Sequence, residues 1–316
     1  MSYAQLFLTL LPVFAMIALG VGLRHFQWIT EMAEDSLFSL VIKIFFPCLI
    51  FESVATNPAL HEPSNLLLPP LLGFGLAVIS MAIAWYVARA LGLTLGRGLR
   101  TFALAAGLAN YGYLPLPLMD AMFGVDSRAV LLVHNVGCDA AVWTAGVLMV
   151  TGLSPLSGWR KLINAPAISL VIAVAVNLGG AAVYIPAAAM ALVHGLAVCA
   201  IPLGLIMTGV SVQPHLNDPK QWVNPRVTAV ALLLRLGMLP VLYLLVAKFL
   251  PCPVELKRVL IVQAAMPSGV SSVLVARLYG GQPLVAVQII LGTTVLALFT
   301  IPLWIHWGLS FVGLAP

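Results

Sequence analysis

The sequence predicts an all-α polytopic membrane protein with ten transmembrane helices, arranged as two inverted five-helix repeats. Of its 316 residues, 62% are hydrophobic and only 8% are charged, whereas a soluble globular chain carries about 25% charged residues. Apolar runs of membrane-spanning length follow one another along the chain, and landmarks of the first half recur in the second. This composition excludes a large soluble domain.

Turn residues and charges separate the apolar runs and set the order of the expected helices. Crossing a hydrocarbon core takes about 20 apolar residues, and most of the runs are that long. Helices are expected because a lipid-exposed segment must satisfy its backbone polar groups internally, and because the alternating pattern of a barrel is missing. In chain order, the helices are predicted near residues 4–23, 34–54, 66–91, 100–122, 128–151, 165–182, 187–211, 227–250, 257–278 and 284–308.

The two five-helix repeats are predicted at residues 1–151 and 165–316, joined by a short cytoplasmic loop at 152–164. Four landmark pairs match when the chain is laid on itself at an offset of about 155 residues: Pro12 with Pro166, Pro47 with Pro202, Gly124 with Gly280, and Gly137 with Gly292. Because each repeat has an odd number of helices, the second must enter the membrane from the opposite face. Inverted repeats are typical of secondary transporters, whose substrate sites lie at the repeat interface near the membrane midplane.

The charges of the chain are informative about topology. Its 15 Lys and Arg and 10 Asp and Glu residues give a formal net charge of +5. They form no basic stripe, so membrane lipid is expected as a partner and nucleic acid is not. With the N-terminus outside, nine Lys and Arg residues fall in cytoplasmic loops and four in external loops, while Lys43 and Arg235 lie within helices. The positive-inside rule therefore predicts a multi-pass protein of the cell membrane with both termini extracytoplasmic.

The fourth and ninth helices are expected to be broken near their middles. Proline removes a backbone donor and glycine permits unusual dihedrals, and both cluster in LANYGYLPLPL and in AAMPSGV. Unwound backbone at membrane depth is tolerated only where it is buried or lines a cavity, and the N-terminus of each half-helix carries roughly +0.5 charge, which suits an anion. Two proline kinks without a ligand are the alternative. The residues expected to bind substrate are Asn110, Tyr111, Gly112, Tyr113, Pro115, Met266, Pro267, Ser268 and Gly269, and the prolines expected to shape the crossing helices are Pro117, Pro47 and Pro202.

Ionisable residues inside the predicted helices are further candidates. A charge at a helix centre costs about 2.5–3.5 kcal/mol on insertion scales, so each should face protein or water. Asp139 and Asn135 are four residues apart and share a helix face, and His134 is adjacent to Asn135. One interpretation pairs Asp139 with Arg235 as a structural ion pair, and the other makes His134 and Asp139 a proton-responsive pair that couples transport to pH. Lys43 either snorkels from a helix end or meets an anion from the scaffold side.

Motifs in both interrupted helices match one group of carriers. In the fourth helix they are Asn110, the pair Pro117 and Leu118, and AMFG at 121–124; in the ninth, IVQAAMPSGV at 261–270. The match continues through LPVFAMIALG in the first helix, FFPCLIF in the second and WRKLI before the sixth. Together these motifs resemble the auxin efflux carrier family, which includes the plant PIN carriers and many bacterial membrane transport proteins, and the resemblance covers nearly the whole chain.

The resemblance implies a two-domain transporter that exports small organic anions, carboxylates in particular, by an elevator-like movement. Helices one, two, six and seven would form a scaffold, through which the chain would form a homodimer. Helices three to five and eight to ten would form a transport domain, with substrate at the crossing of helices four and nine. Asn110 matches the family asparagine that contacts the substrate carboxylate. Ala167 departs from the polar side chain that plant members tend to carry, which argues against an indole-sized ligand held as in plants.

Two other functional classes occur among polytopic membrane proteins of this size. An integral-membrane enzyme is disfavoured because the chain has no HExxH or GxSxG motif and no carboxylate pair at metal-ligand spacing, so no catalytic residue, metal or cofactor is expected. A sodium-coupled organic-anion symporter of the bile-acid carrier type remains the alternative. Asn110 and Gln263 offer amide oxygens for sodium, but no carboxylate adjoins either break.

Overall fold

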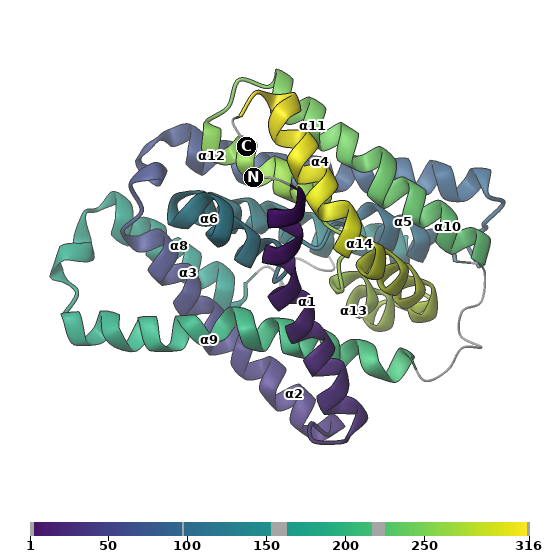
Figure 1. The fold of residues 1–316 in the computed structure, drawn as a ribbon, viewed down its shortest axis with the longest axis horizontal. Helices are drawn as coiled ribbons and strands as arrows, with labels where there is room; N and C mark the ends of the chain where they lie inside the picture. The colour runs from purple at the N-terminus through teal and green to yellow at the C-terminus, as the bar shows by residue number, and fades with distance from the viewer. Residues whose placement is uncertain (1–2, 97, 153–162, 217–224, 315–316) are drawn as a thin grey trace.

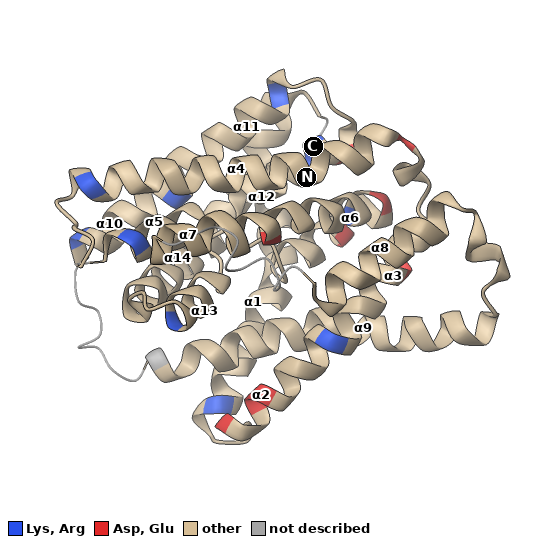
Figure 2. Cartoon of the chain, turned by 180° about the vertical axis from the view of Figure 1, so that it is seen from behind, with Lys and Arg blue, Asp and Glu red and all other residues tan. Residues whose placement is uncertain are grey.

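The computed structural model describes residues 3–96, 98–152, 163–216 and 225–314, and within these ranges every regular element is a helix. The predicted all-α class is therefore confirmed (Figure 1). In the described part of the chain, seven helical stretches are long and apolar enough to cross a membrane: Tyr3–His25, Glu31–Ala55, Pro63–Ala90, Pro115–Thr151, Ala187–Val212, Pro225–Phe249 and Pro283–Val312. Charged residues are few, and most lie near helix ends and in connections (Figure 2).

The first half of the chain contains helices of very different lengths. Its elements are α1 (Tyr3–His25), α2 (Glu31–Leu40), the π-helical turn η1 (Val41–Phe45), α3 (Phe46–Ala55), η2 (Pro58–His61), α4 (Pro63–Ala90), α5 (Leu99–Gly107), α6 (Pro115–Ala141), the π-helical turn η3 (Val142–Gly146) and α7 (Val147–Thr151). The second half contains α8 (Ala165–Leu178), η5 (Ala181–Tyr184), α9 (Ala187–Val212), η6 (Gln213–His215), α10 (Pro225–Leu233), the π-helical turn η8 (Leu234–Met238), α11 (Leu239–Phe249), α12 (Val254–Ala265), α13 (Ser271–Leu278) and α14 (Pro283–Val312).

Local sequence explains where several helices begin. Proline starts α4, α6, α10 and α14, because its fixed φ suits the first helical turn and its missing N–H would have no partner there. Side chains cap two others: the Thr30 hydroxyl accepts from Ala33 N at the start of α2, and Asn164 accepts from Ala167 N at the start of α8. Inside α6 the chain turns at Gly124, whose φ of 75° is a left-handed value that glycine adopts at little cost.

Three of the ten predicted segments do not form continuous helices of spanning length. Segments 100–122 and 257–278 are interrupted, as described below. Segment 165–182 is represented by α8, which has 14 residues, or about 21 Å at the rise of an α-helix, against a hydrocarbon core of about 30 Å. Length and hydropathy alone overlooked that Gly179 and Gly180 end this helix early.

The helices pack into two groups that meet along a shared border. In one group, α1 lies against α9, and α3 lies against α8 and α9; in the other, α4, α5, α6, α11, α12 and α14 pack on one another. Figure 1 shows the first group around α9 and the second around α14. Contacts of α1 with α14 and of α3 with α6 join the groups. Small residues allow the closest helix contacts: a Cβ on Gly209 would lie 1.9 Å from Ile17 O in α1, and one on Gly137 would lie 1.9 Å from Pro70 O in α4.

Candidate functional site

Two interruptions of helical structure lie side by side in the second group. In the first, α5 ends at Gly107 and α6 begins at Pro115; in the second, α12 ends at Ala265 and α13 begins at Ser271. Residues 108–114 and 266–270 are here called break one and break two. Break one contains Gly112 and is followed directly by Pro115 and Pro117 in the first turn of α6, and break two contains Pro267 and Gly269. Each break therefore presents the C-terminus of one helix and the N-terminus of the next, so carbonyl groups point into it from one side and N–H groups from the other.

The two breaks are joined by their backbones, with Ala109 and Ser268 forming an isolated antiparallel bridge. Asn110 N donates to Pro267 O at 2.7 Å, and Gly269 N donates to Leu108 O at 2.9 Å. A Cβ on Gly269 would lie 2.6 Å from Ala109 O, so the approach requires glycine. We call this contact the crossing.

Polar side chains beside the crossing have unused hydrogen-bonding capacity. Ser268 is fully buried, and its hydroxyl has no partner among the described residues; the Nε2 of Gln263 is in the same situation. Asn110 is only half-buried, and its side-chain amide makes no hydrogen bond within the described ranges. Buried polar groups of this kind are completed by ordered water or by a ligand, and side-chain atoms of Asn65, Ser80 and Asn177 elsewhere in the described residues share this condition.

Arg235 lies beneath the crossing in η8 and is completely buried. Its Nε donates to Met266 O at 2.9 Å, its Nη1 to Gly107 O at 3.3 Å and its Nη2 to Gln263 O at 3.3 Å. One guanidinium thus bonds carbonyls at the C-terminal ends of α5 and α12. One of the two interpretations paired Asp139 with Arg235; among the described residues no ion pair joins them, and the guanidinium bonds carbonyls that the helix breaks release.

Asp139, in α6, is linked to break one instead. Its carboxylate accepts a hydrogen bond of 2.6 Å from the Tyr111 hydroxyl. His134 is buried, with Nδ1 lying 3.6 Å from the Cys138 sulfur, and its Nε2 has no partner in the described part of the chain; the same holds for the Asn135 side-chain oxygen. The structure therefore brings Asp139 to the crossing through tyrosine but does not pair it with His134.

Tyr113 connects break one to the other group of helices. Its ring packs so closely on α9 that a Cβ on Gly204 would clash with the ring's Cδ1. The same ring meets Phe46 of α3 edge-on, with centroids 5.4 Å apart. Pro47 follows Phe46 in the first turn of α3, and Pro202 lies within α9 two residues before Gly204.

The remaining predicted residues have less direct roles. Gly112 lies in break one with open space around its Cβ position, and Pro115 and Pro117 form the first turn of α6. Lys43 is exposed on η1. Sequence reasoning missed Thr293 of α14, whose hydroxyl accepts from Ser268 N at 3.2 Å. The only sequence feature that could have indicated Thr293 is its position as a polar residue next to Gly292, which matches Gly137 in the predicted repeat.

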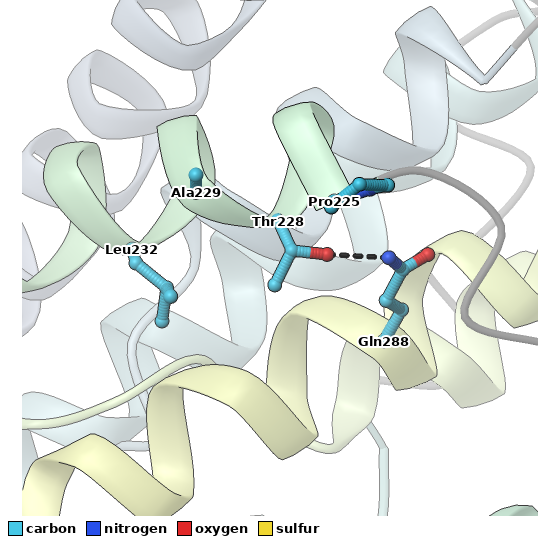
Figure 3. Close-up of a pocket in the computed structure, with 5 residues that line it drawn as sticks. All are labelled: Pro225, Thr228, Ala229, Leu232 and Gln288. Atoms are coloured by element: carbon cyan, nitrogen blue, oxygen red, sulfur yellow. Dashed lines mark hydrogen bonds between the residues drawn. The ribbon is translucent and has the colours of Figure 1, made fainter. Parts of the chain in front are cut away.

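A hollow of about 270 Å³ lies apart from the crossing, between α10 and α14. Figure 3 shows its lining, with the Gln288 amide bonded to the Thr228 hydroxyl. The lining residues are Pro225, Thr228, Ala229, Leu232 and Gln288. None belongs to either break, and the hollow offers mainly apolar surface, so the crossing remains the stronger candidate for an anion site.

Comparison with known proteins supports a transport function for this architecture. A family model described as membrane transport protein matches residues 5–154 and 149–305. An uncharacterized transporter of Methanothermobacter thermautotrophicus is 27% identical over 212 residues, covering 64% of this chain and 67% of the relative.

Proposed function

The chain belongs to the membrane transport protein family, which is the auxin efflux carrier family that its sequence motifs resemble. We propose that it is a secondary-type transporter that exports small carboxylates. The observation that carries this proposal is the crossing, where two interrupted helices are held together at Ala109 and Ser268. Paired broken helices near the midplane are the usual construction of substrate sites in secondary transporters.

The polarity of the crossing favours an anion. The N-termini of α6 and α13 begin there, and each contributes roughly half a positive charge. The cation in the neighbourhood, Arg235, is committed to carbonyls on the opposite side of the breaks. Asn110 and Ser268 supply polar groups without partners among the described residues. A small carboxylate bound between the helix N-termini would satisfy them.

We assign ten membrane crossings in two inverted repeats. The seven long stretches, with α6 divided at Gly124, supply most of them, and α8, the broken pair α5 with the start of α6, and the broken pair α12 with α13 supply the rest. Two observations support the repeat: the broken pairs occupy matching places in the two halves, and the matched glycines Gly124 and Gly280 both have left-handed φ values, 75° and 72°. An even number of crossings puts both termini on the same side of the membrane, and the distribution of Lys and Arg favours the extracytoplasmic side.

The two packing groups fit a scaffold and a transport domain. The scaffold would comprise α1 to α3, α8 and α9, and would also form the homodimer interface; the transport domain would comprise α4 to α7 and α10 to α14. In an elevator-like mechanism the second slides along the first. Tyr113 lies at that border, seated on Gly204 and Phe46, so its contact must break whenever the transport domain moves.

Reconstitution tests the proposal. Purified protein in proteoliposomes should carry radiolabelled mono- or dicarboxylates, measured with and without imposed proton and sodium gradients, with protein-free liposomes as the blank. Asn110→Ala should transport the same substrate poorly although it is equally well inserted. A preference for cations or neutral sugars over every carboxylate would refute the substrate class, and an absolute need for sodium would favour the bile-acid-type symporter.

A further inference from the structure

The largest completely buried side chain in the described residues is a cation, Arg235. Within those residues, no carboxylate lies within ion-pair distance of its guanidinium. Burying a charge without compensation is very costly, and the three carbonyl contacts from Met266, Gly107 and Gln263 contribute to that compensation. Two of these carbonyls belong to α12 and its break, and the third ends α5, so both broken helices contribute.

Carbonyls of this kind commonly bind a different cation. In secondary transporters, unwound backbone carbonyls and half-helix C-termini coordinate the coupling ion, often sodium. Each C-terminus carries roughly half a negative charge, so two of them together nearly balance one positive charge. In this protein a side chain already supplies that charge.

The position is built to hold the guanidinium. Arg235 lies in the π-helical turn η8, which interrupts the α-helix of residues 225–249, and such turns often occur at functional positions. The Tyr243 ring lies 5.8 Å from the guanidinium carbon on the same helical stretch, a distance that suits a cation–π contact. The guanidinium therefore contacts the Tyr243 ring of its own helical stretch and the carbonyls at both breaks.

We propose that Arg235 is a tethered cation that occupies the place of a coupling sodium ion, so that this transporter works without sodium and loss of the guanidinium turns the crossing into a sodium site. The vacated carbonyl oxygens of Gly107, Gln263 and Met266 would then be the ligands. The claim that transport needs no sodium rests on the proposed transport function. The claim that loss of the guanidinium creates a sodium site concerns the crossing alone.

The test compares wild-type protein, Arg235→Met and the control Arg89→Met, which removes an exposed arginine at the end of α4. Melting temperatures are measured in sodium chloride and in choline chloride at equal ionic strength. Sodium should raise the melting temperature of Arg235→Met saturably and leave the other two unchanged. Sodium stabilisation of the wild type, or a folded Arg235→Met protein indifferent to sodium, would overturn the proposal.

A second variant covers failure of Arg235→Met to fold. Arg235→Lys keeps the positive charge and should fold with a melting temperature that does not respond to sodium; a lysine variant that is unfolded or sodium-stabilised would contradict the tethered-cation role. Carboxylate uptake by wild-type proteoliposomes should be equal in sodium and choline. If no carboxylate is transported but sodium stabilises only Arg235→Met, the proposed substrate is wrong while the cation site stands.

Discussion

Gly269→Ala should damage the crossing more than any other single methyl group added to the breaks. The new Cβ would lie 2.6 Å from Ala109 O, 3.2 Å from Ala109 C and 3.5 Å from Asn110 N. All three are backbone atoms of break one, which cannot rotate out of the way as a flexible side chain can. The substitution must therefore push the two breaks apart by several tenths of an ångström or more.

The expected cost follows from the hydrogen bonds that this movement breaks. Asn110 N to Pro267 O, at 2.7 Å, and Gly269 N to Leu108 O, at 2.9 Å, are the two backbone bonds of the crossing. Leaving a buried donor and acceptor unsatisfied costs about 1–3 kcal/mol per bond, so loss of both costs about 2–6 kcal/mol. Partial relaxation would leave a strain of about 1–3 kcal/mol, as in other overpacked cores.

Thermal unfolding of the purified protein in detergent measures this effect, and Gly112→Ala is the matched control. Gly112 lies in break one, but a Cβ there finds no atom within 4 Å, and its φ is not left-handed. Gly112→Ala should melt close to the wild-type temperature, whereas Gly269→Ala should melt well below it and lose carboxylate binding. Equal melting temperatures for the two variants would refute the close backbone contact at the crossing.

Three further predictions concern the surroundings of the crossing. Asn110→Ala should weaken carboxylate binding roughly ten- to hundredfold, because one donor to a charged ligand contributes about 1.5–3 kcal/mol, with an unchanged melting temperature; wild-type affinity would remove the asparagine from the site. Gly204→Ala should slow transport and lower the melting temperature because its methyl group meets the Tyr113 ring, and Tyr113→Ala in the same chain should restore stability; no restoration would exclude that contact. Asp139→Asn should fold, since its amide oxygen can still accept from Tyr111. If Asp139 carries a proton during transport, this variant should lose the pH dependence of uptake, and an unaltered pH profile would exclude that role.

Much of the local structure follows from residues that can be recognised in the sequence. Proline at positions 115, 225 and 283 marks helix starts because it lacks a donor that the first turn would leave unpaired. Gly124 marks the turn between the fourth and fifth predicted segments because it alone adopts a left-handed φ there. Asn110, Gly112, Pro267 and Gly269 lie in the breaks, whereas Pro115 and Pro117 lie in the first turn of α6, where proline is tolerated.

Partners across the chain were harder to predict. Apolarity around each helix removed the periodicity that would have indicated which face packs against which neighbour. The contact of Tyr113 with Gly204 joins residues about 90 positions apart, and the hydrogen bond from Ser268 to Thr293 joins residues 25 positions apart. Only the folded arrangement brings these residues together. Insertion costs correctly implied that Asp139 and Arg235 are satisfied within the protein, but that argument does not specify the partner.

The true partners of Arg235 explain how an anion site can form without a positive side chain in it. Each broken helix contributes a negative and a positive end to the crossing, and the two nearly cancel unless something separates them. Arg235 binds the carbonyl ends of α5 and α12, which neutralises their partial charge. The partial positive charges at the N-termini of α6 and α13 are then not compensated. On this reasoning the buried arginine favours a carboxylate ligand from behind the crossing, while Asn110 and Ser268 provide the directional hydrogen bonds that a helix terminus alone does not.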